Sequence, residues 1–103
     1  MELAEVQRLM DELYGEADRA RGVPSTVAWL AEELGELAQA MRKGTREQQV
    51  HEFGDVLAWL ASLANQMDID LDDAMRSSTA PDDDPFDDDL HQGASVILGR
   101  PEI

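Results

Sequence analysis

The chain has 103 residues, of which 43% are hydrophobic and 30% charged, so we expect a single small globular domain with a thin core. Its net charge of −15, from 23 acidic and 8 basic residues, disfavours binding to nucleic acids and anionic membranes, although a divalent cation could still bridge such a surface to a polyanion. The absence of cysteine excludes disulfides, thiolate metal sites and cysteine nucleophiles.

The N-terminal segment is acidic and amphipathic, which is not typical of a signal peptide. Apolar residues recur at helical spacing from Leu3 to Ala17 and predict a first helix that ends near Gly22. No apolar run approaches the roughly 20 residues needed to cross a bilayer. We therefore expect a cytoplasmic protein that has no membrane partner.

A second helix is predicted to begin at Pro24 with Ser25 or Thr26 and to end at Gly44, a common C-terminal residue. Its apolar residues fall on one stripe, which comprises Val27, Leu30, Leu34, Leu37 and Met41.

Two further helices follow. Thr45 and Gln48 have the spacing of a capping box and predict a third helix that extends to about Met67. Asp70 can cap a short fourth helix that ends around Arg76. Because no segment alternates with a period of two, the predicted fold class is all-α, a four-helix bundle. The apolar stripes need partners, so we expect oligomerisation to complete the bundle, with at least a dimer.

The predicted helical domain covers residues 1–76, and the character of the chain changes in residues 77–103. This segment contains two runs of three aspartates, at 82–84 and 87–89. Successive like charges resist compaction, so the sequence favours an acidic, flexible tail over a metal-binding role.

Acidic residues of the second helix lie beside its apolar stripe. With about 100° per residue and Glu33 at 0°, Leu37 falls at about 40° and Leu30 at about 60°. Glu36 lies at about −60° and Glu32 at about −100°. Glu33 therefore borders the buried stripe, Glu36 is next to it, and Glu32 is nearer to solvent.

On the third helix, Glu52 lies in the middle of an apolar face. With Glu52 at 0°, Val56 falls at about 40° and Trp59 at about −20°. Asp55, at about −60°, lies at the edge of this face. An isolated ionised carboxylate in such surroundings is costly unless it takes up a proton or a cation neutralises it.

A divalent metal is the favoured cation, because no Lys or Arg lies between Glu47 and Arg76. Residues at i and i+3 share a helix face, so each helix presents two carboxylates side by side. Four carboxylates suit Mg²⁺, with Mn²⁺ as a possible substitute. The predicted metal ligands are Glu33, Glu36, Glu52 and Asp55.

Two other interpretations of these acids are less favoured. Ordinary surface decoration suits Glu32 and Glu47, but not Glu52 with its apolar neighbours. Di-iron carboxylate bundles use Glu-x-x-His pairs, and neither His51 nor His91 completes such a pair on a bundle helix.

The pattern Glu32-Glu33-x-x-Glu36, followed after fifteen residues by Glu52-x-x-Asp55, resembles the signature of MazG-like all-α nucleoside triphosphate pyrophosphohydrolases. The resemblance covers roughly residues 1–76. It implies a helical homodimer or homotetramer that uses Mg²⁺ to hydrolyse a (d)NTP between its α- and β-phosphates. It also implies that the four predicted ligands hold the metal and that Glu32 orients a water molecule.

Three more residues are candidates for substrate binding. Lys43, at about −80° on the second helix, could reach a phosphate or cap the helix. Trp29, at about −40°, could stack on a base or pack internally. Asn65 resembles an Asn that related enzymes place near the nucleotide, but it faces away from Glu52, so it would have to serve a neighbouring subunit. For Trp59 a core or interface role is favoured.

The chain departs from the resemblance after the last helix, where relatives carry Lys or Arg. Here no basic residue lies between Arg76 and Arg100. The favoured function is a house-cleaning pyrophosphohydrolase. A non-catalytic oligomer that binds metal or nucleotide stays open, as does a narrower enzyme related to dUTPases or to those acting on phosphoribosyl-ATP.

Overall fold

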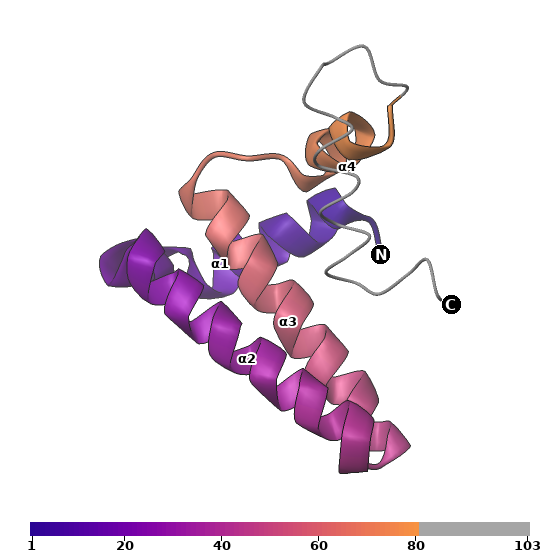
Figure 1. The fold of residues 1–103 in the computed structure, drawn as a ribbon. Coiled ribbons are helices and arrows are strands. Elements are labelled where there is room, and N and C mark those ends of the chain that lie inside the picture. The colour runs from indigo at the N-terminus through magenta and orange to yellow at the C-terminus, as the bar shows by residue number, and fades with distance from the viewer. Residues whose placement is uncertain (81–103) are drawn as a thin grey trace, which may run out of the picture.

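The computed structural model describes residues 1–80, which form four helices and no strand (Figure 1). The helices are α1 (Leu3–Arg21), α2 (Val23–Lys43), α3 (Arg46–Gln66) and α4 (Leu71–Thr79). The predicted all-α fold class is confirmed. The aspartate runs lie outside the described residues. Within residues 1–80, no helix has the length and apolar character that a bilayer span requires.

Helix α2 begins earlier than the sequence suggested, because Gly22 makes the turn from α1. Gly22 has a φ of 88°, a backbone conformation that glycine adopts without strain. The chain therefore re-enters a helix at Val23, with Pro24 in the first turn, where no backbone N–H is needed. Thr26 does not cap the helix. Its Oγ1 instead donates a hydrogen bond to the carbonyl of Gly22, at 2.9 Å.

The turn between α2 and α3 matches the sequence prediction closely. Gly44 ends α2, and its N–H donates to the carbonyl of Ala40 at 2.8 Å. Thr45 Oγ1 then accepts a hydrogen bond from Gln48 N–H at 3.1 Å, while Gln48 Oε1 accepts one from Thr45 N–H at 2.8 Å. The predicted capping box is present, and α2 and α3 form an antiparallel pair.

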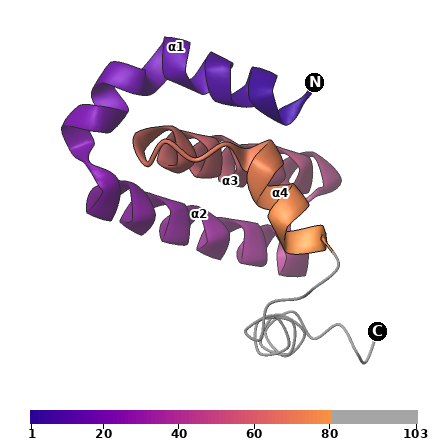
Figure 2. The ribbon, with the colours of Figure 1, turned by 90° about the horizontal axis from the view of Figure 1, so that it is seen from above.

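Helix α3 is the central element, with α1 on one side of it and α2 on the other (Figure 2). Helix α4 lies across one end and is joined to α1 by Gln7, whose Oε1 accepts a hydrogen bond from Leu71 N–H at 2.9 Å. Asp70 caps α4 by accepting from Asp73 N–H at 3.0 Å, as predicted. Helix α4 ends at Thr79, three residues beyond the predicted end around Arg76.

The buried apolar core of residues 1–80 is small and consists of Met10, Ala40, Ala61 and Ala64. Much of the predicted apolar stripe of α2 is exposed, and so is a second row on α3. We call these two rows the outer apolar face; its members are Val27, Leu34, Met41, Val50, Phe53, Leu57 and Leu60. Residues 1–80 of a single chain therefore leave uncovered a large part of the surface that the sequence marks as buried.

Candidate metal and nucleotide site

The acids that the sequence singled out meet between α2 and α3. Glu33 and Glu36 of α2 and Glu52 of α3 each offer a carboxylate oxygen, and these oxygens lie within 4.8 Å of one another. Glu52 also belongs to a second group of the same size with Asp55 and His51. The i, i+3 spacing on each helix and the antiparallel pairing of the helices bring all four predicted ligands together around Glu52.

Two oxygens in this cluster are buried and have no hydrogen-bond partner among the described residues. They are Oε2 of Glu33 and Oε2 of Glu52. The side chain of Glu52 is 15% exposed, although the residue is acidic and stands one turn before Val56. Buried polar atoms in native proteins are nearly always paired, so two unpaired carboxylate oxygens in one cluster are well suited to bind a cation.

The electrostatics of the cluster agree with this interpretation. Burial raises the pKa of Glu33 to about 7, and a hydrogen bond with Glu36 and repulsion from Glu36, Asp55 and Glu52 add to the effect. Burial also raises the pKa of Glu52, with repulsion from Glu36 and Asp55 adding to it and His51 opposing it. Both carboxyls are held in surroundings that penalise their negative charge.

Within residues 1–80, the ion pairs that arginine side chains form all lie outside the acid cluster. Arg19 pairs with Asp11, Arg21 with Asp18, and Arg76 with Asp72 and Asp73. A divalent cation therefore fits the cluster well. Four carboxylates match the oxygen ligands that Mg²⁺ and Mn²⁺ prefer, and binding would satisfy the two unpaired oxygens.

His51 is a member of the site that the sequence analysis set aside. Its Nε2 lies 3.1 Å from Oδ2 of Asp55 and 3.9 Å from Oε1 of Glu52. The signal was available, because His51 and Asp55 are separated by four residues and such pairs meet on one helix face. This histidine pairs with Asp55 one turn later, so the absence of a Glu-x-x-His pair does not remove it from the acid cluster.

A cavity of about 990 Å³ opens beside the acids at the α2–α3 turn. Glu36, Glu52 and His51 line it on the side of the cluster. Lys43, on the same helix as Glu36, also lines it. Glu32 is exposed on α2 and belongs to neither of the two groups of ligand atoms.

The two tryptophans form a pair across α2 and α3. The rings of Trp29 and Trp59 are stacked, with centroids 5.8 Å apart and planes 8° from parallel. The guanidinium carbon of Arg21 lies 4.9 Å from the ring centroid of Trp59. Trp29 is thus partly engaged in packing, and Trp59 links it to the end of α1.

The family model of the MazG nucleotide pyrophosphohydrolase domain matches residues 21–80. The chain belongs to the MazG family. The matched region contains α2, α3, α4 and all four acids, and members of this family act on nucleotides and typically depend on a divalent metal. No curated protein matches the chain.

Most of α1 precedes the MazG match, yet a residue of α1 is hydrogen-bonded to Asn65, one of the predicted site residues on α3. Asn65 Nδ2 donates a hydrogen bond to the carbonyl of Gln7 at 2.9 Å, and Gln7 Nε2 donates one to Asn65 Oδ1 at 3.1 Å. The amide of Asn65 therefore joins α3 to α1. It lies on the side of α3 away from Glu52, where the helical wheel put it.

Proposed function

We propose that this MazG protein is a metal-dependent nucleoside triphosphate pyrophosphohydrolase that cleaves (d)NTPs to (d)NMP and pyrophosphate and so removes unwanted nucleotides from the pool. The observation that carries the proposal is the pair of buried, unpaired oxygens of Glu33 and Glu52, which lie in one cluster with Glu36 and Asp55. Such a cluster is costly in the free protein and useful once a divalent cation and a polyanionic substrate share it.

The four carboxylates would hold Mg²⁺, and Mn²⁺ would serve as a substitute. When bound, the cation would offset the charge of the triphosphate and make its α-phosphorus more electrophilic. The protein needs no nucleophile of its own for this reaction, since a water molecule supplies the oxygen. The bond that breaks joins the α-phosphorus to the bridging oxygen, which leaves with pyrophosphate.

Two side chains outside the cluster complete the proposed machinery. Glu32, the exposed neighbour of Glu33, would accept a hydrogen bond from the attacking water and orient it. Lys43 would bind the β- and γ-phosphates in the cavity that it shares with Glu36 and His51. This lysine supplies a positive charge that the segment between Arg76 and Arg100 lacks.

We further propose that the functional unit is a homodimer or homotetramer in which a second copy covers the outer apolar face. The two rows of this face follow helical spacing on α2 and α3, and the chain has no other described element over them. A contiguous apolar surface of this kind is unusual on a monomer and typical of an interface.

The test of the proposed reaction is pyrophosphate release from the four canonical dNTPs and dUTP, measured with and without Mg²⁺. Turnover that requires the metal is expected for at least one substrate. If no substrate is turned over while Mg²⁺ and nucleotide still bind, the protein is a non-catalytic binding module, the alternative that the basic-poor segment after Arg76 left open. Turnover of dUTP alone would identify the narrower, dUTPase-like enzyme.

A further inference from the structure

Asp55 lies at the edge of the acid cluster. The oxygens of Glu33, Glu36 and Glu52 form one group within 4.8 Å, whereas Asp55 belongs to the other group, with Glu52 and His51. The Asp55 side chain is 36% exposed, and its repulsion helps to raise the pKa values of Glu33 and Glu52. Because this repulsion pushes Asp55 outward, a contact is needed to hold it beside the other acids.

The side chain that contacts Asp55 is His51, one helical turn earlier on α3. Its Nε2 lies 3.1 Å from Oδ2 of Asp55, which is within the range of hydrogen-bond lengths. The i, i+4 spacing places the two side chains on one face of the helix. Within residues 1–80, no other side chain forms a hydrogen bond or an ion pair with Asp55. The position of Asp55 therefore depends on His51.

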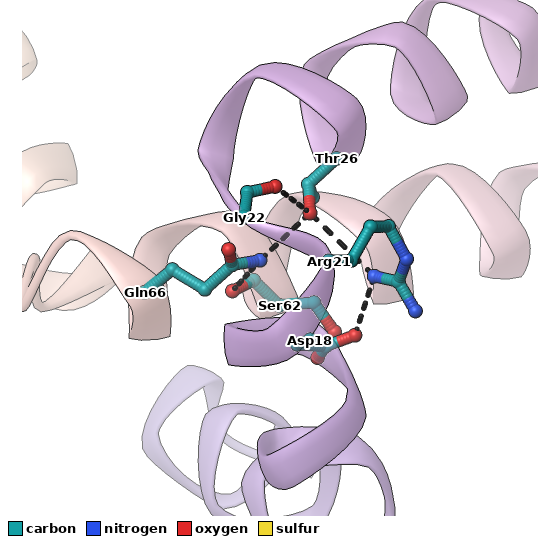
Figure 3. A network of polar contacts seen from close by, with 6 residues as sticks. All are labelled: Asp18, Arg21, Gly22, Thr26, Ser62 and Gln66. Carbon is teal, nitrogen blue, oxygen red and sulfur yellow. Dashed lines mark hydrogen bonds and ion pairs between the residues drawn. The ribbon is translucent and has the colours of Figure 1, made fainter.

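Elsewhere the chain fixes a buried carboxylate in a different way. Asp18 is 3% exposed, and its Oδ1 accepts a hydrogen bond from Nη1 of Arg21 at 2.7 Å (Figure 3). Arg21 Nη1 also lies 3.5 Å from Oγ1 of Thr26, which accepts a hydrogen bond from Gln66 Nε2 at 2.8 Å. An arginine is always charged, so the charge of Asp18 is neutralised within the protein and is not left for a metal.

A histidine beside Asp55 has the opposite consequence. Neutral imidazole carries one N–H group, so His51 can donate to Asp55 without cancelling the negative charge of the cluster. A carboxylate has two oxygens, and a donor that holds one of them orients the other for a metal ion. The His51 side chain is 69% exposed and lines the cavity at the α2–α3 turn, so it adds little to the core of the protein.

We propose that His51 is a positioning residue of the metal site, which holds Asp55 in place through the contact of its Nε2 with Oδ2 and is not itself a metal ligand. This inference rests on the proposed function, because it concerns the same acid cluster. Loss of His51 would leave all four carboxylates present but Asp55 free to turn away from the others. Such partners of metal ligands typically contribute about 10–100-fold to metal affinity.

The test compares His51→Ala with His51→Gln. The amide nitrogen of glutamine can take the place of Nε2 and donate to Asp55, and it is never charged. Mg²⁺ and Mn²⁺ affinities are measured by calorimetry without nucleotide. We expect His51→Ala to weaken binding about tenfold or more and His51→Gln to restore most of it. Both replacements are good helix formers, so circular dichroism should show an intact α3.

Arg76→Ala is the matched control for the loss of an exposed contact. Arg76 Nη2 lies 2.7 Å from Oδ2 of Asp72, with the same i, i+4 spacing, but on α4 and outside the acid cluster. Its loss should leave metal affinity unchanged. Thr26→Val controls for stability, because it removes a hydroxyl from the buried network of Figure 3. It should lower the melting temperature and leave metal affinity unchanged.

The outcomes separate the role of His51 from the proposed reaction. Unchanged metal affinity in His51→Ala would overturn the positioning role, even if the wild type releases pyrophosphate. A loss that His51→Gln does not restore would also overturn it, because His51 would then act as a metal ligand. A wild type that hydrolyses no (d)NTP, with metal binding that still weakens in His51→Ala and recovers in His51→Gln, would contradict the proposed function alone.

Discussion

Glu52 is the residue on which the proposed chemistry depends most. We expect Glu52→Gln to reduce metal-dependent pyrophosphate release at least about a hundredfold, because the amide keeps the shape of the side chain but cannot neutralise a cation. Its metal-free melting temperature should not fall, since the substitution removes a buried negative charge. The matched control is Glu12→Gln, at an exposed position of α1, which should leave both quantities unchanged. Full turnover by the Glu52 variant would show that the ligands are assigned wrongly.

The raised pKa of Glu33 predicts an unusual dependence of protein stability on pH. Its pKa is raised from 4.5 to about 7 in the folded protein, so the folded state binds the proton more tightly than the unfolded state does. This contribution to stability is fully present below about pH 4.5 and is lost as the pH rises through about 7. The metal-free protein should therefore melt at a lower temperature at pH 8 than at pH 5.5. A loss of about 1 kcal/mol corresponds to roughly 4–8 °C in a domain of this size.

Two comparisons can assign this pH dependence of stability to the acid cluster. Glu33→Gln has no proton to lose, so its melting temperature should change less between pH 5.5 and pH 8. Saturating Mg²⁺ should stabilise the wild type most at pH 8, where the carboxylates are ionised. A metal-free wild type that is equally stable at both pH values would contradict the account of Glu33.

At the residue scale, the sequence was informative where helical geometry alone fixes the neighbours. Glu33, Glu36, Glu52 and Asp55 could be grouped because each pair lies on one helix face and the helices are consecutive. Arg21 could not be found in this way. It reaches Trp59 only because Gly22 reverses the chain and lays α1 along α3, and the sequence does not encode that packing in any local spacing.

At the element scale, the α2–α3 turn holds the two acid pairs in register, and Gly44 is critical to it. A Cβ at this position would lie 2.8 Å from both the Cα and the carbonyl oxygen of Ala40, and neither backbone atom can move without distorting the helix. We expect Gly44→Ala to destabilise the protein by about 1–3 kcal/mol in denaturant unfolding. The metal affinity of this variant should also fall, since the turn sets the alignment of α2 and α3.

Gly35 provides the matched control on the same helix. A Cβ there would meet nothing within 4 Å, and the residue is in the interior of α2. Gly35→Ala should therefore stabilise the protein by about 0.5–1 kcal/mol, because alanine loses less conformational freedom in a helix. Equal destabilisation by both substitutions would show that close packing at the turn is not the cause.

The boundaries of the elements show why local signals succeed at one junction and fail at another. The α2–α3 turn was predicted correctly because Gly44, Thr45 and Gln48 form a sequence-local cap. Ser25 and Thr26 are typical capping residues, yet α2 begins at Val23, one residue before the predicted Pro24, because Gly22 supplies the turn. Thr26 is free to bond the Gly22 carbonyl and to accept from Gln66, a partner forty residues away.

At the scale of the whole molecule, the outer apolar face is the reason for which we propose an oligomer. Angular positions around each helix axis are measured from Glu33 on α2 and from Glu52 on α3. These two residues face each other across the helix pair. The exposed row of α2 lies at about 80–120° from Glu33, and that of α3 at about 80–160° from Glu52. In antiparallel right-handed helices the same sense of rotation leads to the same side of the pair. The two rows therefore form one surface, opposite the side that carries Trp29 and Asp55.

This geometry makes a specific prediction about assembly. Phe53 is 58% exposed within the outer apolar face. Phe53→Arg should therefore convert the proposed oligomer into a monomer, as sedimentation velocity would show. Arginine is chosen because it adds no negative charge to an already acidic chain. Met75→Arg, at an exposed position of α4 outside this face, is the matched control and should leave the assembly intact. A wild type that sediments as a monomer at micromolar concentration would contradict the prediction. So would a Phe53→Arg variant that remains associated, because the partner would then have to bind elsewhere on the helices.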